Sequence, residues 1–503
     1  MCRMRLVALA VLLVCTWGSA LRAETPAQKV PCWFDIPDRE RAVCYRVTVP
    51  VRYDDGSAGT MSLPVAILKS RADIPAPDPV VVIQGGPGSS FFHTAYPEDP
   101  DAAWWWQMTA PARQTRDVVI YDQRGVGLAE PNLNCFEADE VARSAAKPPG
   151  VEIPFFDRER AEIRQCHDRL VADGIDLAAF STPANADDLA LMVSALGYDT
   201  VNLWGMSYGT RVALVTLRRH PDLVRSVVLD GVYPPHIRAD ESTPWATYRV
   251  FTRIFDDCAK DPWCARTYGD LGPRFADLLE NLNDKPRAIE VGDDERWDDG
   301  ATALMDGNLV VFHAYDALYY SEAIPYVLAV IARAADGDPD ELGWFYWYPY
   351  FADWALDEGA FLSVTCREEQ PRIDADVLAE GVETYDVYGE AGATILTDDI
   401  CDDWPVPPAA ADEAEAVESD VPVLLLSGAY DPVTPPEWAA DAAGYLSNSR
   451  NFEFLGGSHV VSANDNCTSR YVADFFDDPD PASLAPPECP LFSKPADFSS
   501  VKW

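Results

Sequence analysis

The sequence predicts an α/β protein with a mostly parallel central sheet, flanked by helices and interrupted by a long helical insertion. Short runs rich in Val, Ile and Leu alternate with longer stretches of helical periodicity, as expected for a parallel sheet that is buried on both faces. The expected strands are residues 80–83, 118–121, 201–204, 226–229, 423–426 and 452–455. Each run ends in a loop that contains Gly or Asp, and reactive groups gather at the strand ends of such sheets. A helix is expected over residues 185–196, because Thr182 and Pro183 introduce it and Gly197 closes it.

The alternation of strand and helix patterns stops between residues 240 and 420, where the sequence becomes helical and rich in aromatic residues. A dense run of Trp, Tyr and Phe at residues 344–354 predicts a cap inserted into the main domain, although any single ring could equally be ordinary core of a helical subdomain. Residues 406–419 are rich in Pro, Ala and Glu, which is typical of a linker. We therefore assign residues 24–239 and 416–503 to the two parts of the core and residues 240–415 to the cap.

The charge balance excludes two classes of partner. The chain has 82 acidic against 39 basic residues, a formal net charge of −43. Nucleic acids and anionic membrane surfaces are bound by clustered cations, so neither is expected as a main partner. Apolar residues make up 48% of the chain, which separates it from disordered acidic proteins. Such a charge suits a soluble exported protein, and it would favour substrates with a cationic N-terminus.

Residues 1–23 have the pattern of a cleaved signal peptide. Arg3 and Arg5 precede a short apolar run, and small residues follow it. That run is too short to cross a bilayer, and no other segment approaches about 18 uninterrupted apolar residues, so stable membrane insertion is not expected. A lipoprotein acceptor at Cys15 is the weaker alternative, because Val14 stands where a small residue would be needed. The sequence predicts a periplasmic or secreted protein.

Two of the twelve cysteines lie in this leader, and the rest fall into pairs that are close in sequence. An even number of cysteines in an exported protein indicates disulfides, although sequence alone does not fix their connectivity. The expected pairs are Cys32 with Cys44, Cys135 with Cys166, Cys258 with Cys264, Cys366 with Cys401, and Cys467 with Cys489. A metal site is the alternative, but the chain has no CxxC motif and only six scattered histidines. Neither a metal nor an organic cofactor is expected.

The candidate nucleophile is Ser207, in residues 205–209 (GMSYG). An apolar strand precedes this G-x-S-x-G motif and a helix follows it. The two glycines relieve crowding in a tight strand-to-helix turn, so that the hydroxyl can project above the sheet at the positive end of the helix. The motif also occurs by chance in plain turns, but the strand and helix around it favour a nucleophile.

A serine hydroxyl needs a base to take its proton and an acid to orient that base. His459 is the candidate base, because it follows the last expected strand in a glycine-containing loop and comes after the other two residues in the chain. The remaining histidines have contexts that favour structural or surface roles. Asp431 is the preferred acid, in a loop with Gly and Pro after the strand 423–426. Asp230 is its rival, and would otherwise make structural hydrogen bonds to backbone groups.

Residues 84–90 (QGGPGSS) are the candidate oxyanion loop. Acyl transfer needs hydrogen-bond donors aimed at the developing oxyanion, and a loop without side chains can approach the substrate closely. We expect the N–H of Gly86, or that of Gly85, to act together with the N–H of Tyr208. A glycine turn without function is the alternative for this loop taken alone.

Three motifs in this order resemble the prolyl iminopeptidase and tripeptidyl aminopeptidase branch of the α/β-hydrolases: residues 85–88 (GGPG), 122–127 (DQRGVG) and 205–209. The resemblance extends over nearly the whole mature chain. It is greater for the secreted tripeptidyl aminopeptidase-like members, because Gln84 stands where prolyl iminopeptidases usually have His. It implies the α/β-hydrolase fold with an inserted cap and a serine exopeptidase that removes proline, another residue or a short peptide from an N-terminus.

The resemblance also implies roles for individual residues. Ser207, Asp431 and His459 would form the triad, and the 122–127 turn would support the site rather than react. Cap carboxylates would bind the free ammonium of a peptide substrate.

The best local candidates for that amine site are Glu368 and Glu369, which an expected disulfide at Cys366 would hold in place. A solvated acidic pair is an equally open interpretation. A carboxylesterase with the same triad but no amine site, and a catalytically silent binding protein, are the alternative functions.

Overall fold

The computed structural model describes residues 26–92, 104–137, 155–290, 302–345, 356–395 and 400–501. The expected leader, residues 1–23, lies outside these ranges, as does most of the aromatic run at 344–354. Among the helices of the described ranges, none combines the length and the hydropathy that crossing a membrane requires.

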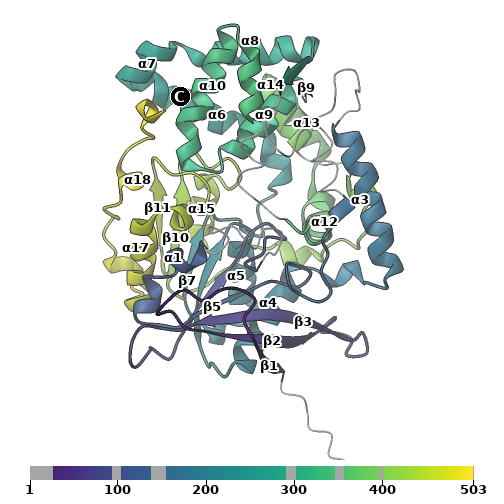
Figure 1. Cartoon of the computed structure of the whole chain (residues 1–503), viewed down its shortest axis with the longest axis vertical. Helices are drawn as coiled ribbons and strands as arrows, with labels where there is room; N and C mark the ends of the chain where they lie inside the picture. The colour runs from purple at the N-terminus through teal and green to yellow at the C-terminus, as the bar shows by residue number, and fades with distance from the viewer. Residues whose placement is uncertain are drawn as a thin grey trace, which may run out of the picture.

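A nine-stranded sheet forms the centre of the described chain (Figure 1). Its strands lie in the order β1-β2-β3-β5-β4-β6-β7-β10-β11. Neighbours are parallel from β5 to β11, whereas β1, β2, β3 and β5 alternate in direction. The strands are β1 (Ala27–Val30), β2 (Ala42–Pro50), β3 (Thr60–Leu68), β4 (Val80–Ile83), β5 (Val118–Tyr121), β6 (Val201–Met206), β7 (Val224–Asp230), β10 (Val423–Gly428) and β11 (Ser449–Phe454). The predicted α/β class with a mostly parallel sheet is confirmed.

The six predicted strands are present as β4, β5, β6, β7, β10 and β11. The last of them begins at Ser449 and ends at Phe454, one residue before the predicted end. Sequence reasoning missed β1, β2 and β3. Strands β1 and β2 lie at a sheet edge and lack a continuous apolar run, whereas β3 is buried from Leu63 to Leu68 but has Pro64 within its run. In β2, for example, Val47 and Val49 are buried and Thr48 between them is exposed.

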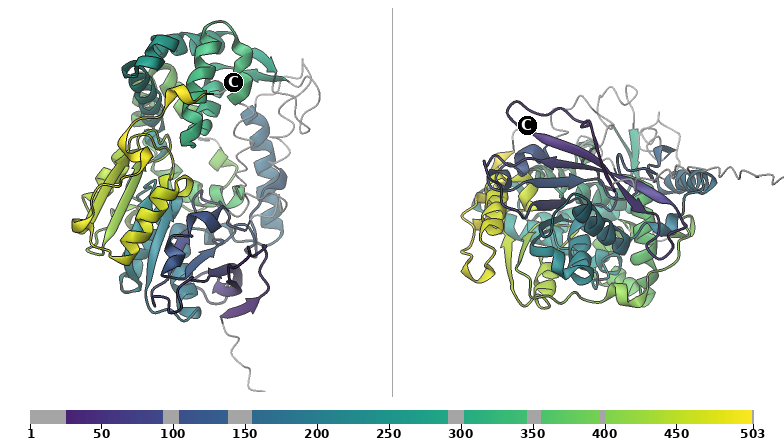
Figure 2. Two further views of the ribbon diagram at one scale, coloured as in Figure 1. Left: turned by 60° about the vertical axis from the view of Figure 1, so that its left-hand side comes forward. Right: turned by 90° about the horizontal axis from the view of Figure 1, so that it is seen from below.

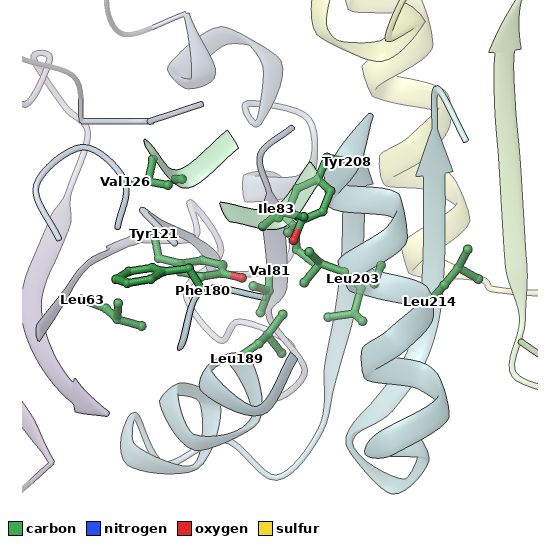
Figure 3. Packing of buried hydrophobic residues seen from close by; sticks show 14 of the residues in the cluster. Leu63, Val81, Ile83, Tyr121, Val126, Phe180, Leu189, Leu203, Tyr208 and Leu214 are labelled. Atoms are coloured by element: carbon green, nitrogen blue, oxygen red, sulfur yellow. The ribbon is translucent and has the colours of Figure 1, made fainter. Parts of the chain in front are cut away.

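Helices cover both faces of the sheet, as the left view of Figure 2 shows. Alternate residues of β4 mark the two faces. Val81 and Ile83 join one buried cluster with α3, α4, α5, α12 and α15, and Val80 and Val82 join another with α1, α16 and α17. Part of the first cluster is drawn in Figure 3. These helices are α1 (Trp105–Met108), α3 (Phe155–Ala172), α4 (Thr182–Ala195), α5 (Tyr208–Arg219), α12 (Glu358–Glu368), α15 (Pro436–Ala443), α16 (Val461–Asn464) and α17 (Asn466–Asp477). The helix predicted over residues 185–196 is α4, which starts earlier because Ser181 caps it.

A second body of helices lies between β7 and β10 in the chain and above the sheet in Figure 1. It has its own hydrophobic cluster, in which residues of α6, α8, α9, α10 and α14 pack together. Its elements are α6 (Thr243–Lys260), α7 (Pro262–Tyr268), α8 (Leu271–Asp284), β8 (Arg287–Glu290), β9 (Thr302–Met305), α9 (Gly307–Ala317), α10 (Ile324–Ala335), α13 (Ala375–Thr384) and α14 (Asp386–Ile395). We call these elements the cap. Helix α12 falls within the same stretch of sequence but packs on the sheet through Ala360, Leu362 and Val364.

Five disulfides are present in the described ranges, and they join the five predicted pairs. The Cys366–Cys401 bond ties the end of α12 to the short helix η8 (Ile400–Asp402). The Cys258–Cys264 bond links α6 to α7 in the cap. Cytosolic proteins rarely keep such bonds, so this set indicates a protein that works outside the cytoplasm.

Candidate active site

Ser207 lies in the turn between β6 and α5, with φ 53° and ψ −125°. Few residues other than glycine adopt a positive φ, and such strain is characteristic of functional turns. The turn is also very crowded. A Cβ atom at Gly205 would come 2.5 Å from the carbonyl oxygen of Gly209, and one at Gly209 would collide with the carbonyl of Ile83. The predicted strand, tight turn and helix around Ser207 are therefore present, and both motif glycines are sterically required.

His459 and Asp431 meet at the ends of the last two strands. His459 Nδ1 lies 2.8 Å from Asp431 Oδ2, and the two side chains are 2% and 0% exposed. Thr434 Oγ1 donates to the same carboxylate oxygen over 2.7 Å and lies 3.2 Å from His459 Nδ1. The other ring nitrogen, Nε2, is buried and receives no hydrogen bond from any described residue. A general base would use this nitrogen.

Backbone contacts bring the histidine next to the serine turn. The N–H of Ser207 donates to the carbonyl of Asp230 over 2.9 Å. At the next residue, Gly231, a Cβ atom would come 3.2 Å from Cε1 of His459. The imidazole therefore packs on the strand end that is hydrogen-bonded to Ser207. The structure thus brings the three predicted residues to one edge of the sheet.

The two candidate acids differ in what they bind. Burial alone would raise the pKa of Asp431, but His459 and the hydrogen bonds from Thr434 lower it below its usual value. Asp230 instead accepts the N–H groups of Val461 and Ser462 over 3.1 and 2.7 Å. Burial raises the pKa of Asp230 to about 6, against these hydrogen bonds. Asp230 thus fixes the backbone that follows His459, whereas Asp431 contacts the imidazole.

The glycine loop approaches the serine closely. A Cβ atom at Gly85 would lie 2.8 Å from Cβ of Ser207, so only glycine fits there. The N–H of Gly85 donates to Oε1 of Gln84 over 3.0 Å. Since that donor is engaged, the geometry favours Gly86 of the two predicted alternatives. Tyr208, the other predicted donor, directs its ring into the core beside Ile83 (Figure 3).

Glu368 and Glu369 lie at the end of α12 and are both buried. Glu368 accepts from the N–H and hydroxyl of Thr182 over 2.7 and 2.6 Å. Glu369 forms an ion pair with Arg211 of α5, whose guanidinium lies 3.8 Å from the ring centre of Tyr233. Burial raises the pKa of Glu368, although the nearby Arg211 opposes the shift. The structure therefore places both predicted amine-binding residues in a buried network with the nucleophile helix.

Sequence reasoning missed Asp316, on the cap helix α9. This half-buried carboxylate has no hydrogen bond or ion pair with any residue in the described ranges, and burial raises its pKa to about 7. Tyr319, just beyond α9, packs its ring against His459 with the ring centres 5.0 Å apart. The pKa of Tyr319 is raised by burial and then by the negative charges of Asp316 and Asp431, so both acids lie near this tyrosine. The signal in the sequence was an acid inside an aromatic helical stretch, residues 315–320 (YDALYY).

Two families match the chain. The one described as alpha/beta hydrolase fold matches residues 78–271, which include Ser207, and the one described as TAP-like protein matches residues 386–483, which include Asp431 and His459.

Three curated relatives show how far these similarities extend. The serine protease Hip1 of Mycobacterium tuberculosis is 26% identical over 90% of this chain and 88% of its own. Carboxylesterase B of the same organism is 27% identical over 88% of this chain and 85% of its own. The tripeptidyl aminopeptidase of Streptomyces lividans is 31% identical over 30% of this chain and 28% of its own. The chain therefore combines an α/β-hydrolase domain with a TAP-like domain, and its similarity to these relatives supports a serine hydrolase.

Proposed function

We propose that the protein is an exported serine exopeptidase that cleaves peptide bonds near a free N-terminus, of the prolyl or tripeptidyl aminopeptidase type. The observation that carries this proposal is the buried Asp431–His459 pair, whose Nε2 makes no hydrogen bond within the described chain and whose ring packs on the strand end that binds Ser207. Similarity to Hip1, a serine protease, and to a tripeptidyl aminopeptidase supports peptides as substrates. The disulfides support export.

In the proposed mechanism, His459 Nε2 takes the proton of Ser207 as Oγ attacks the scissile carbonyl carbon. Asp431 stabilises the imidazolium that forms. The N–H groups of Gly86 and Tyr208 bind the oxyanion of the tetrahedral intermediate. His459 then returns the proton to the leaving amine, the C–N bond breaks, and an acyl-enzyme remains. Water attacks this ester with His459 again as the base, which releases the acyl product and restores Ser207.

For the substrate ammonium, we propose Asp316 as the principal partner. A carboxylate that is partly desolvated and has no cation in the described chain gains most from an incoming ammonium. Glu369 is already paired with Arg211, and Glu368 already accepts a hydrogen bond from Thr182. Pulling Glu369 away would leave Arg211 with Glu368 at 3.7 Å as its remaining carboxylate, which weakens a buried ion pair at a cost in stability. The amine-binding role predicted for the two glutamates is the alternative that the assay below also tests.

A carboxylesterase is the second candidate, favoured by the similarity to Carboxylesterase B over most of both chains. It would use the same triad and oxyanion loop without a site for an ammonium. Free and N-acetylated Pro-, Ala- and tripeptidyl-anilides, measured beside a short-chain ester, distinguish the two. Turnover of free-amine anilides that needs Ser207 supports the exopeptidase, and Ser207→Ala is the control. Equal turnover of blocked anilides, or turnover of esters alone, would contradict it, and the absence of Ser207-dependent turnover would indicate a binding protein.

Variants of the three acids then locate the amine site. Asp316→Asn should raise KM for free anilides without raising it for blocked esters. Glu368→Gln and Glu369→Gln should leave that ratio unchanged. A selective rise in KM for either Gln variant would instead assign the site to the glutamates.

A further inference from the structure

Asp357 immediately precedes α12, and it uses its carboxylate in an unusual way for its position. An Asp at a helix N-cap normally accepts N–H groups of its own first turn. Here the side chain makes no such bond. Its Oδ2 accepts the N–H of Gly127 over 2.6 Å, and its Oδ1 accepts Nδ2 of Asn132 over 2.9 Å. The side chain is buried, and it joins α12 to the turn that begins at Asp122.

The backbone at the same place contacts the oxyanion loop. The N–H of Asp357 donates to the carbonyl of Gly88 over 3.0 Å, and Leu356 forms an antiparallel bridge with Ser89. A Cβ atom at Gly88 would come 2.8 Å from the carbonyl oxygen of Asp357, so the two segments are in tight contact. A short strand-like pairing therefore lies directly against the loop that contains Gly86.

A second carboxylate completes the arrangement. Asp122 accepts the N–H of Phe91 over 2.7 Å and the hydroxyl of Ser90 over 2.9 Å, which holds the far end of the loop. Its other oxygen accepts the N–H of Leu128 over 2.9 Å. The backbone N–H groups of residues 127 and 128 thus donate to two different acids, one that follows β5 and one that precedes α12. The oxyanion loop is attached at both its middle and its end.

We propose that Asp357 is a positioning residue for the oxyanion hole. It touches no reacting atom, and its role is to hold the loop so that the N–H of Gly86 points at the developing oxyanion. This inference rests on the proposed acyl transfer at Ser207. Because an oxyanion donor acts mainly in the transition state, a displaced loop lowers kcat more than it changes KM.

The test compares Asp357→Ala and Asp357→Asn with the wild-type protein. Removing one oxyanion donor outright costs about 100- to 1000-fold in kcat, and a displaced donor should cost at least about tenfold. We expect Asp357→Ala to lose about that much kcat on anilide and ester alike, with KM within about twofold. Asp357→Asn should recover part of the loss, because its amide can accept only one of the two donors. If the Ala variant does not fold, the Asn variant decides.

A transition-state analogue gives the readout that a general structural role would not produce. Binding of a peptidyl trifluoromethyl ketone, which places an oxyanion in the hole, should weaken by the same factor as kcat, while inhibition by the product peptide stays unchanged. The matched control is Asp261→Ala, which removes an acid that accepts the N–H groups of Trp263 and Cys264 at the start of α7. It should lower Tm without changing kcat.

Two results would overturn the inference: a folded Asp357 variant with unchanged kcat, or a loss of kcat without weaker binding of the ketone. Failure of the proposed function is seen separately. Turnover of esters alone rejects the exopeptidase but still allows the Asp357 comparison. Turnover that survives Ser207→Ala rejects both proposals.

Discussion

The ring of Tyr319 meets the ring of His459 nearly at a right angle, with the ring centres 5.0 Å apart and the planes at 73°. The first residue follows a cap helix and the second belongs to the loop after β11. Two nearby residues bind the same loops by hydrogen bonds: Tyr315 Oη of the cap helix α9 donates to the carbonyl of Pro432 over 2.9 Å, and Ser321 Oγ, which follows α9, accepts the N–H of Ser458 over 2.9 Å. The cap therefore supports both the acid loop and the histidine loop.

From this contact we predict that Tyr319→Ala lowers kcat/KM by about tenfold. Edge-to-face aromatic pairs contribute about 0.5–1.5 kcal/mol beyond area burial, and the lost ring would let the imidazole move. Tyr319→Phe keeps the ring and should stay within about twofold of the wild type. Steady-state kinetics on one anilide measure both. If the Phe variant is as impaired as the Ala variant, the hydroxyl and not ring packing is responsible.

Thr434 should contribute to orienting the acid. Thr434→Val keeps the shape of the side chain and removes the hydroxyl that donates to Asp431. A hydrogen bond to a charged group contributes about 1.5–3 kcal/mol, so kcat should fall by at least about tenfold with little change in KM. Thr434→Ser, which retains the hydroxyl, is expected to keep most of the activity. Equal activity of the Val and Ser variants would show that the hydroxyl is dispensable.

The pKa of Asp316 predicts a pH dependence that is specific for substrates with a free amine. Burial raises this pKa to about 7, so the carboxyl loses its charge as the pH falls through 7. The α-amino group of a peptide loses its own charge above about pH 8. The ratio of kcat/KM for a free anilide to that for a blocked ester should therefore be highest between about pH 7 and 8 and fall towards acid.

Taking this ratio removes the titration of groups such as Asp122 and Asp230, which affects both substrates. Asp316→Asn should lower this ratio at neutral pH and remove its decrease towards acidic pH. A wild-type ratio that does not change between pH 5.5 and 7.5 would exclude Asp316 from amine binding.

Breaking the buried ion pair of Arg211 should be strongly destabilising. Arg211→Met removes the nearer of the two cations that contact the buried Glu369, the other being Arg372 at 3.8 Å, and removal of one partner of a buried pair costs up to about 3–5 kcal/mol. Urea unfolding measures the loss. The double variant Arg211→Met, Glu369→Gln should recover part of the stability, and no recovery would mean that the charge is not the cause.

The features that the sequence predicted share a local origin. Residues 80–83 form a strand because a fully buried parallel strand is a continuous apolar run, and residues 205–209 form the serine turn because strand, glycines and helix are adjacent. The disulfides join cysteines that are near in sequence, so their pairing could be predicted as well.

The features that were missed depend on contacts between distant segments. Asp357 and Gly127 are 230 residues apart, and no local pattern marks the side chain that crosses this distance. Arg211 pairs with Glu369 at the end of α12, so this acid is buried and not solvated. The sequence left both interpretations open, because no local pattern marks a partner so distant in the chain. That Asp316 has no partner among the described residues is visible only in the folded cap. Sequence patterns identify groups that can react, but the packing of remote elements decides which acids are free to bind a ligand.

The pairing of β7 with β10 sets the order in which the protein can mature. Val227 of β7 pairs with Val423 of β10, so the central sheet cannot be completed until the whole insertion between these strands has been synthesised. Contacts so distant in sequence make folding slow. A nascent chain that ends before β10 holds Ser207 but neither Asp431 nor His459. The three residues of the proposed triad can therefore meet only after the segment that follows the insertion has been synthesised.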